Sequence, residues 1–153
     1  MKSNHRGLHG TQYGSIGTWG PHADVPGGLA RLAAHYPLVI LSNAADDQIP
    51  SNVAQLGAPF DRVLTAQQAQ AYKPRLAAFE YMFAELGVRP DEIVHVSSSL
   101  RYDLMPAHDL GIVNTVYVNR GYEPEAPQYG YTEIRSIEEL PGLFGIGPNG
   151  ART

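Results

Sequence analysis

Residues 94–111 read VHVSSSLRYDLMPAHDLG, and this stretch decides the fold. It continues a short apolar run, Ile93–Val96, which is typical of a buried strand. Three serines interrupt the run, and a helix is expected from about Asp103, its N-cap, to Gly111, its stop. In open α/β sheets, ligands bind where a strand ends in a polar loop before a helix. The stretch therefore predicts both a central strand and a candidate site.

The same unit recurs along the chain. The apolar run Leu38–Leu41 predicts a second buried strand, and further strands are expected at Arg62–Leu64 and Asn114–Val118. Segments with helical periodicity separate them. Asp24 is expected to cap the first of these helices, and Asp46 or Asp47 the second. Because strands alternate with helices, the predicted fold class is α/β, a Rossmann-like three-layer α/β/α arrangement with a parallel sheet.

The 153 residues are enough for one domain with a real core. Residues 1–20 are polar and glycine-rich and show neither helical nor strand periodicity, which predicts a poorly ordered N-terminal segment. The core is expected over residues 21–146. Residues 147–153 are expected to form a disordered tail.

Composition excludes several classes of function. The net charge of −4 argues against a nucleic-acid partner. The chain has no cysteine, so disulfide frameworks and thiolate metal sites are excluded. No apolar run is long enough to span a bilayer, and the start of the chain is not a signal peptide, so a cytoplasmic protein without a membrane partner is expected.

Polar residues gather at the predicted carboxyl ends of strands and at helix starts. The candidates are Ser42-Asn43, Lys73-Pro74 and the serines Ser97–Ser99 with Asp103. Each of them alone has a plain structural explanation as a turn, a surface loop or a cap. His95 lies within the apolar run and is expected to be structural rather than catalytic. The order and spacing of the set are more informative than any single member.

As an ordered set, these motifs resemble the haloacid dehalogenase superfamily. Leu41-Ser42-Asn43 resembles its second motif, Tyr72-Lys73-Pro74 its third, and His95 to Asp103 its fourth. The similarity runs from about Ser15 to Phe144. Within the superfamily, the motif sequences most resemble those of the type II 2-haloacid dehalogenases. This resemblance implies a hydrolase core that cleaves a carbon–halogen bond next to a carboxylate of a small 2-haloacid. It also implies a homodimer.

The resemblance implies a role for each matched residue in covalent catalysis by a carboxylate. Ser42 and the backbone at Asn43 would bind the substrate carboxylate. Lys73 would keep the nucleophile ionised, and Ser98 would position groups around that pair. Asp103 would hold Lys73 and help to activate the hydrolytic water.

Ser98 also bears on the reaction type. Metal-dependent phosphatases of the superfamily usually carry an aspartate at the matching position, and Mg²⁺ prefers carboxylate ligands. The resemblance therefore favours a dehalogenase that needs no cofactor and no metal. Magnesium enters only if the alternative, a phosphatase of the same superfamily, holds.

One family motif has no counterpart in this sequence. The nucleophilic aspartate of the family ends a first strand, and nothing before Trp19 is an apolar run ending in aspartate. The chain thus resembles the C-terminal part of such an enzyme, an N-terminally truncated core. In the family, the missing strand lies between the strand ending at Ser42 and the one ending near Ser97. Three consequences stay open: low stability, direct closure of those two strands, or a second chain in the gap.

Three functions remain open at this point. The first is a dehalogenase-like hydrolase whose nucleophile is missing from this chain. The second is a non-catalytic remnant or interaction module on the same scaffold. The third is a phosphatase. Release of halide, release of phosphate, or neither would separate them.

Overall fold

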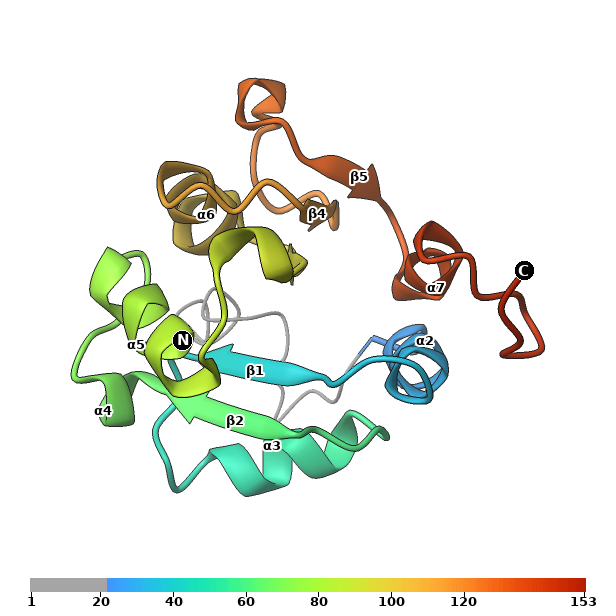
Figure 1. Ribbon diagram of the computed structural model, residues 1–153, viewed down its shortest axis with the longest axis horizontal. Coiled ribbons are helices and arrows are strands. Elements are labelled where there is room, and N and C mark those ends of the chain that lie inside the picture. Colours follow the sequence, from blue (N-terminus) through green and yellow to red (C-terminus); the bar gives the residue numbers. More distant parts are fainter. Residues whose placement is uncertain (1–21) are drawn as a thin grey trace.

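The computed structural model describes residues 22–153, in which parallel strands alternate with helices (Figure 1). The helices are α2 (Val25–Ala33), α3 (Ile49–Gln55), α4 (Ala66–Ala69), α5 (Leu76–Leu86), α6 (Met105–Asp109) and α7 (Leu140–Leu143). Short 3₁₀ turns are η1 (Pro90–Glu92), η3 (Pro127–Tyr129) and η4 (Ile137–Glu139), and η2 (Leu100–Leu104) is a π-helical turn. This alternation confirms the predicted α/β class.

The strands form two separate parallel sheets. In the first, β1 (Val39–Ser42) pairs with β2 (Arg62–Thr65). In the second, β4 (Thr115–Val118) lies between β3 (His95–Ser97) and β5 (Thr132–Ile134). No ladder joins β1 to β3 within residues 22–153, so these two strands have not closed up directly.

The predicted strands are present, with small shifts. The run predicted at 93–96 is the least accurate, because β3 begins two residues later and extends into the first serine. The sequence prediction missed β5 altogether. Its Thr-Glu-Ile segment is only three residues long and only Ile134 is buried, so it contains no apolar run to detect.

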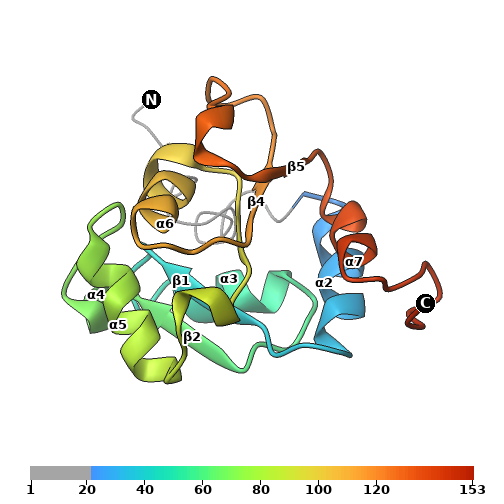
Figure 2. The ribbon, with the colours of Figure 1, turned by 45° about the horizontal axis from the view of Figure 1, so that its top comes forward.

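Helices cover both faces of the strands, which gives the three layers. On one face, β1, β4 and β5 pack against α2, α7 and η4 around a cluster that includes Leu29, Ile40 and Ile137. On the other face, α5 and α6 pack around Leu41, Leu64 and Phe79. Figure 2 shows α2 beside α7 at one end of the molecule and α4 beside α5 at the other.

The structure modifies two predicted helix caps. Asp24 occupies the N-cap position of α2, as predicted, but its side chain makes no capping hydrogen bond; its carboxylate accepts hydrogen bonds from Arg120, Ser136 and the Ile137 amide instead. The prediction of Asp46 or Asp47 as the cap of α3 is wrong, because the N-cap is Gln48, and Asp46 accepts a hydrogen bond from Thr65 Oγ1. In both cases a donor distant in the sequence competes successfully for a carboxylate that local spacing assigns to the helix. The capping box predicted at Ser136 is present and begins η4.

The sequence predicts poor order in two terminal segments, residues 1–20 and 147–153. Residues 1–20 lie outside the described residues. Residues 147–153, expected as a disordered tail, fold back here: Ile146 bridges Arg152, and the Arg152 guanidinium donates to Tyr36 Oη at 2.6 Å. In the part of the chain that the structure describes, no helix is long and apolar enough to cross a bilayer.

Candidate active site

The segment after β1 fixes the position of Lys73. Asn43 follows β1, and its side-chain amide binds the Lys73 backbone twice. Lys73 N donates to Asn43 Oδ1 at 2.8 Å, and Asn43 Nδ2 donates to Lys73 O at 3.1 Å. The peptide bond from Lys73 to Pro74 is cis. The predicted second and third motifs are thus in direct contact, and the end of β1 determines where the lysine side chain starts.

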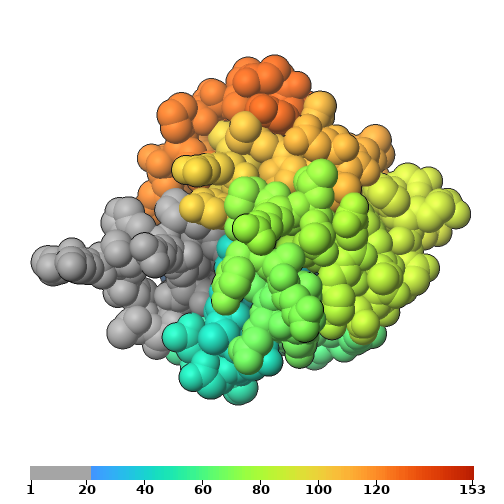
Figure 3. Space-filling model, turned by 90° about the vertical axis from the view of Figure 1, so that its left-hand side faces the viewer, coloured from blue at the N-terminus to red at the C-terminus, as the bar shows by residue number. Residues whose placement is uncertain are grey.

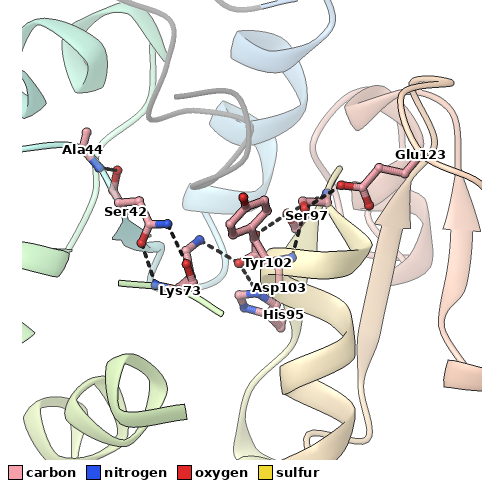
Figure 4. Close-up of polar contacts among 10 residues, drawn as sticks. Ser42, Ala44, Lys73, His95, Ser97, Tyr102, Asp103 and Glu123 are labelled. Carbon is pink, nitrogen blue, oxygen red and sulfur yellow. Dashed lines mark hydrogen bonds and ion pairs between the residues drawn. The ribbon is translucent and has the colours of Figure 1, made fainter. Parts of the chain in front are cut away.

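Lys73 and Asp103 form an ion pair without access to solvent. Lys73 Nζ donates to Asp103 Oδ1 at 2.7 Å, and both side chains are 0% exposed (Figure 4). His95 Nε2 lies 3.0 Å from the same oxygen, and Ser97 Oγ donates to Oδ2 at 3.0 Å. Because a carboxylate only accepts, the His95 hydrogen facing it is on Nε2. A buried carboxylate with three donors satisfies the requirement that a buried charge be paired and hydrogen-bonded.

Asp103 is not the N-cap that the sequence predicts. The chain after β3 enters the π-helical turn η2, whose N-cap is Ser99, and Ser99 Oγ accepts from Tyr102 N at 3.2 Å. Asp103 lies inside this turn, one residue before its end. The turn directs the carboxylate inward to Lys73, which is 30 positions away in the sequence.

Glu123, from the loop after β4, holds the start of η2. Its carboxylate accepts from Leu100 N at 2.6 Å, from Arg101 N at 3.3 Å and from Ser99 Oγ at 3.0 Å. The negative charge therefore meets the free backbone amides at the amino end of the turn, where negative charge is stabilising. Glu123 thus supports the turn that presents Asp103, as Figure 4 shows.

The pKa values of the pair shift in ways that follow from burial and charge. Burial lowers the pKa of the Lys73 ammonium, and the Asp103 carboxylate only partly offsets this effect. Burial alone would raise the pKa of Asp103. The Lys73 charge and the His95 hydrogen bond together outweigh burial and lower that pKa below its usual value. Asp103 is therefore held as a carboxylate and is a weak acceptor of further protons.

The other two predicted residues, Ser42 and Ser98, lie at the carboxyl ends of β1 and β3. Ser42 is buried at the end of β1, and its Oγ accepts from Ala44 N at 3.0 Å. Ser98 is buried and directly follows β3. The structure thus places Ser42, Asn43, Lys73, Ser98 and Asp103 at one edge of the two sheets, with direct contacts among Asn43, Lys73 and Asp103.

The donor set within residues 22–153 does not fit a magnesium ion. The one carboxylate that contacts Lys73, Asp103, already accepts hydrogen bonds on both oxygens. No group of three or more His, Cys, Asp or Glu side chains that could hold a metal occurs in this range. Mg²⁺ is usually bound through one or two carboxylates and several waters, so at this site it would have to compete with these hydrogen bonds for the oxygens of Asp103.

Sequence reasoning missed three supporting residues. His95 was expected to be structural, yet its ring contacts Asp103 and packs edge-on against Phe79 at 5.4 Å between ring centres. Ser97 was noted only as part of a serine run. Glu123 lies in a Gly/Pro-rich loop with no periodicity, so nothing local marks it. For His95 and Ser97 a signal was available, because strand residues two apart point to the same side.

Known proteins are similar to this chain over most of its length. (S)-2-haloacid dehalogenase 4A of Burkholderia cepacia is 32% identical over 114 residues, covering 71% of this chain and 48% of that protein. (S)-2-haloacid dehalogenase 1 of Pseudomonas sp. (strain CBS-3) is 31% identical over 130 residues, covering 80% and 56%. The chain spans about half the length of these curated relatives. No protein-family model matches the chain.

The fold comparison points to the same superfamily. The crystal structure of a HAD phosphatase from Thermococcus onnurineus superimposes with a TM-score of 0.71 at 30% identity, covering 87% of this chain and 60% of that one. The similarity thus includes dehalogenases and a phosphatase. The chain belongs to the haloacid dehalogenase superfamily and is similar to its type II 2-haloacid dehalogenases.

Proposed function

We propose that the chain provides the charged framework of a hydrolytic site that removes halide from a small 2-haloacid through an aspartyl ester. The observation that carries the proposal is the buried Lys73–Asp103 pair at the carboxyl edge of both sheets. Burial lowers the pKa of the ammonium, so a second anion beside it would favour its charged form. The similarity to two (S)-2-haloacid dehalogenases supports this choice of reaction.

The proposed reaction has two steps. A carboxylate oxygen attacks the carbon bearing the halogen, forming a C–O bond while the halide leaves with the bonding electron pair. Water then adds to the ester carbonyl carbon, loses a proton to a base, and releases the 2-hydroxy acid and the free carboxylate. Asp103 is the one carboxylate of residues 22–153 within ion-pair distance of Lys73, and its oxygens are occupied. The attacking carboxylate therefore has to come from outside those residues.

Each site residue among residues 22–153 would have a separate role in this reaction. Lys73 would hold the attacking carboxylate in its ionised form, and Asp103 would fix the lysine. The lowered pKa of Asp103 supports this holding role more than a role in activating water. Ser42 and the Asn43 backbone would bind the substrate carboxylate, and Ser98 would position groups beside the ion pair. No cofactor takes part in this scheme.

A phosphatase is the second candidate, supported by the similarity to the HAD phosphatase. Ser98, at the position where phosphatases of the superfamily usually carry an aspartate, favours the dehalogenase over it. A non-catalytic interaction module on the same scaffold is the third. The family resemblance also carries proposals of a cytoplasmic homodimer without nucleic-acid or membrane partners.

Halide and phosphate release test the proposal directly. The native protein purified from its own cells is incubated with (S)-2-chloropropionate and, separately, with p-nitrophenyl phosphate and Mg²⁺. We expect chloride release that is lost in Lys73→Met. In H₂¹⁸O we expect ¹⁸O in an aspartate of the protein, because water attacks the ester carbonyl carbon. Phosphate release without chloride would replace the proposal by the phosphatase, and neither product from folded protein would leave the interaction module.

A further inference from the structure

One side of β3 carries two of the three donors to Asp103. His95 begins this strand and Ser97 ends it. Residues two apart in a strand point to the same side. His95 Nε2 lies 3.0 Å from Asp103 Oδ1, and Ser97 Oγ donates to Oδ2 at 3.0 Å. The strand therefore holds both oxygens of the carboxylate at once.

His95 and Lys73 share one oxygen of this carboxylate. Lys73 Nζ donates to Asp103 Oδ1 at 2.7 Å, so Oδ1 accepts from an ammonium and from the His95 ring. Among residues 22–153, the other oxygen accepts only from Ser97. A second donor on an oxygen stabilises part of its negative charge. The His95 bond therefore acts directly on the contact between Lys73 and Asp103, whereas the Ser97 bond lies on the other oxygen.

Packing against α5 orients the His95 ring. The side chain is 11% exposed, and the ring lies edge-on to Phe79 with 5.4 Å between ring centres. Phe79 is fully buried in the cluster that α5 and α6 share. Figure 3 shows the green residues of α4 and α5 at the surface on this side of the molecule, so these helices cover the interior there. The core therefore supports the position of the imidazole, in addition to the bond with Asp103.

The contact with Asp103 also fixes which ring nitrogen of His95 carries the hydrogen. Lys73 holds the carboxylate in its ionised form, and an ionised carboxylate only accepts, so the hydrogen is on Nε2. A protonated imidazole keeps this N–H and gains a second one on Nδ1. His95 is therefore a donor to Asp103 in its neutral form and in its protonated form.

We propose that His95 is a positioning residue for the Lys73–Asp103 pair: its donation to the oxygen that Lys73 uses fixes the carboxylate and weakens the hold of that carboxylate on the ammonium. The direction follows from the shared oxygen. The positive end of the His95 N–H dipole lies beside the ammonium and offsets part of the attraction of Oδ1. In agreement, the His95 hydrogen bond helps to lower the pKa of Asp103, and the pKa of Lys73 stays below its ordinary value although Asp103 raises it.

The weaker hold has a consequence for the reaction, and this consequence rests on the proposed function. In that reaction Lys73 would face an attacking carboxylate as well as Asp103. An ammonium that is drawn strongly to one anion is less available to a second one. His95 would thereby leave more of the Lys73 charge for the attacking carboxylate. The positioning of the pair itself does not depend on the reaction.

Lysine NMR of the full chain tests the effect on the ammonium. Lys2 and Lys73 are the only lysines of the sequence, so ¹³Cε labelling reports on few signals, and Lys2→Arg assigns that of Lys73. In the wild type we expect this signal to titrate below the ordinary lysine range, because burial lowers the pKa of Lys73. In His95→Met we expect it to titrate at a higher pH than in the wild type, because Asp103 Oδ1 is then left to the ammonium alone. An unchanged titration would overturn the proposal.

His95→Gln is the matched control for His95→Met. Both side chains are unbranched and similar in size, so both variants lose the ring contact with Phe79. Glutamine carries N–H donors at its end, and methionine carries none. We expect His95→Gln to keep the Lys73 titration close to that of the wild type. Equal shifts in the two variants would mean that His95 acts through packing alone, which contradicts the proposal.

A measurement on the wild type does not depend on how well the variants fold. An unfolded variant is recognised because its Lys73 signal then coincides with that of Lys2. In the wild type, ¹⁵N-histidine NMR reports the tautomer, and the spectrum of His95→Gln assigns the His95 ring. We expect its hydrogen on Nε2 and slow exchange of this hydrogen with solvent. A hydrogen on Nδ1 alone, or exchange as fast as in His108, whose side chain is 53% exposed, would overturn the proposal.

Chloride release from (S)-2-chloropropionate separates the positioning role from the proposed function. We expect kcat to fall about fivefold in His95→Met, the effect of losing one hydrogen bond, with KM nearly unchanged, and to recover in His95→Gln. The NMR results without chloride release by the wild type would keep the positioning role and remove the proposed reaction. Chloride release by His95→Met at the wild-type rate, with the Lys73 titration shifted, would overturn the consequence for the reaction.

Discussion

At the scale of single residues, the site depends on a charge pair whose members are expensive to separate. Asp103 has three donors, and Lys73 has this carboxylate as its described counter-ion. Breaking a buried pair by removing one partner is strongly destabilising because the other charge remains buried without compensation. The pair is therefore a structural requirement as well as a proposed functional one.

We predict that Lys73→Met lowers the free energy of unfolding by about 3 kcal/mol, because Asp103 would lose its ammonium partner in a dry site. Asp103→Asn should cost a similar amount by leaving the lysine charge uncompensated. The double variant should lose clearly less than the sum, since both charges are then gone. Urea unfolding of the four proteins measures this coupling, and additive losses would show that the two charges do not depend on each other.

The sequence predicted the pair but not the rest of its surroundings. Lys73 and Asp103 were identified through the order of three motifs, which the fold brings together at the ends of two strands. The spacing predicts Asp103 as a helix cap, because spacing alone cannot show that a lysine 30 residues away competes for its carboxylate. The sequence predicts a structural role for His95, because a histidine in an apolar strand usually has one.

At the scale of elements, the turn after β3 carries Asp103, and Glu123 supports this turn. The η2 turn is only five residues long, so its own hydrogen bonds stabilise it little. The carboxylate of Glu123 binds two of its amides and the Ser99 hydroxyl. The position of Asp103 therefore depends on a loop that begins after a different strand.

We predict that Glu123→Gln lowers the free energy of unfolding by about 1–2 kcal/mol, because a neutral amide loses the charge-assisted bonds to the turn. NMR shifts should reach the His95 ring and Ser97, which contact Asp103. Glu125→Gln is the matched control from the same loop. Glu125 accepts a single bond, from Asn119 at 3.3 Å, and its loss should cost less than about 0.5 kcal/mol. Equal losses in the two variants would mean that Glu123 contributes no more than an ordinary surface carboxylate.

Elements with strong local signals were predicted well, and elements without them were not. β1 and β4 follow from continuous apolar runs that only a buried strand explains. β5 depends on pairing with β4, and the π-helical form of η2 depends on Glu123, so both are set by contacts distant in the sequence. The predicted burial of Ile93–Val96 is wrong in degree, because Val94 is exposed and the other three residues are only half-buried.

At the scale of the whole molecule, Asp24 joins segments that lie far apart in the chain. Its carboxylate receives both bonds from Arg120 Nη2, at 2.9 and 3.1 Å, and one from the Ile137 amide at 2.6 Å. It thereby ties the start of α2 to the loop after β4 and to η4. Burial alone would raise the pKa of Asp24, but the hydrogen bonds and the Arg120 charge outweigh it and lower that pKa.

The lowered pKa values of Asp24 and Asp103 predict acid sensitivity of the whole fold. An aspartate in the unfolded chain has a pKa of about 3.9. The pKa values of Asp24 and Asp103 are lower in the fold. At a pH between the folded and unfolded pKa values, the unfolded chain therefore binds more protons than the folded protein. Their stabilisation is complete above about pH 5 and is lost as pH falls through the folded pKa values. The lowered pKa of Lys73 makes stability rise with pH between its folded value and the ordinary lysine value, because the unfolded chain binds more protons there. Urea midpoints from pH 7 to pH 3 should therefore fall steeply for the wild type. They should fall less for Asp24→Asn, which starts lower at pH 7, whereas the exposed control Asp47→Asn should follow the wild-type curve. If Asp24→Asn kept the full acid slope, the tie between α2 and η4 would contribute nothing to it.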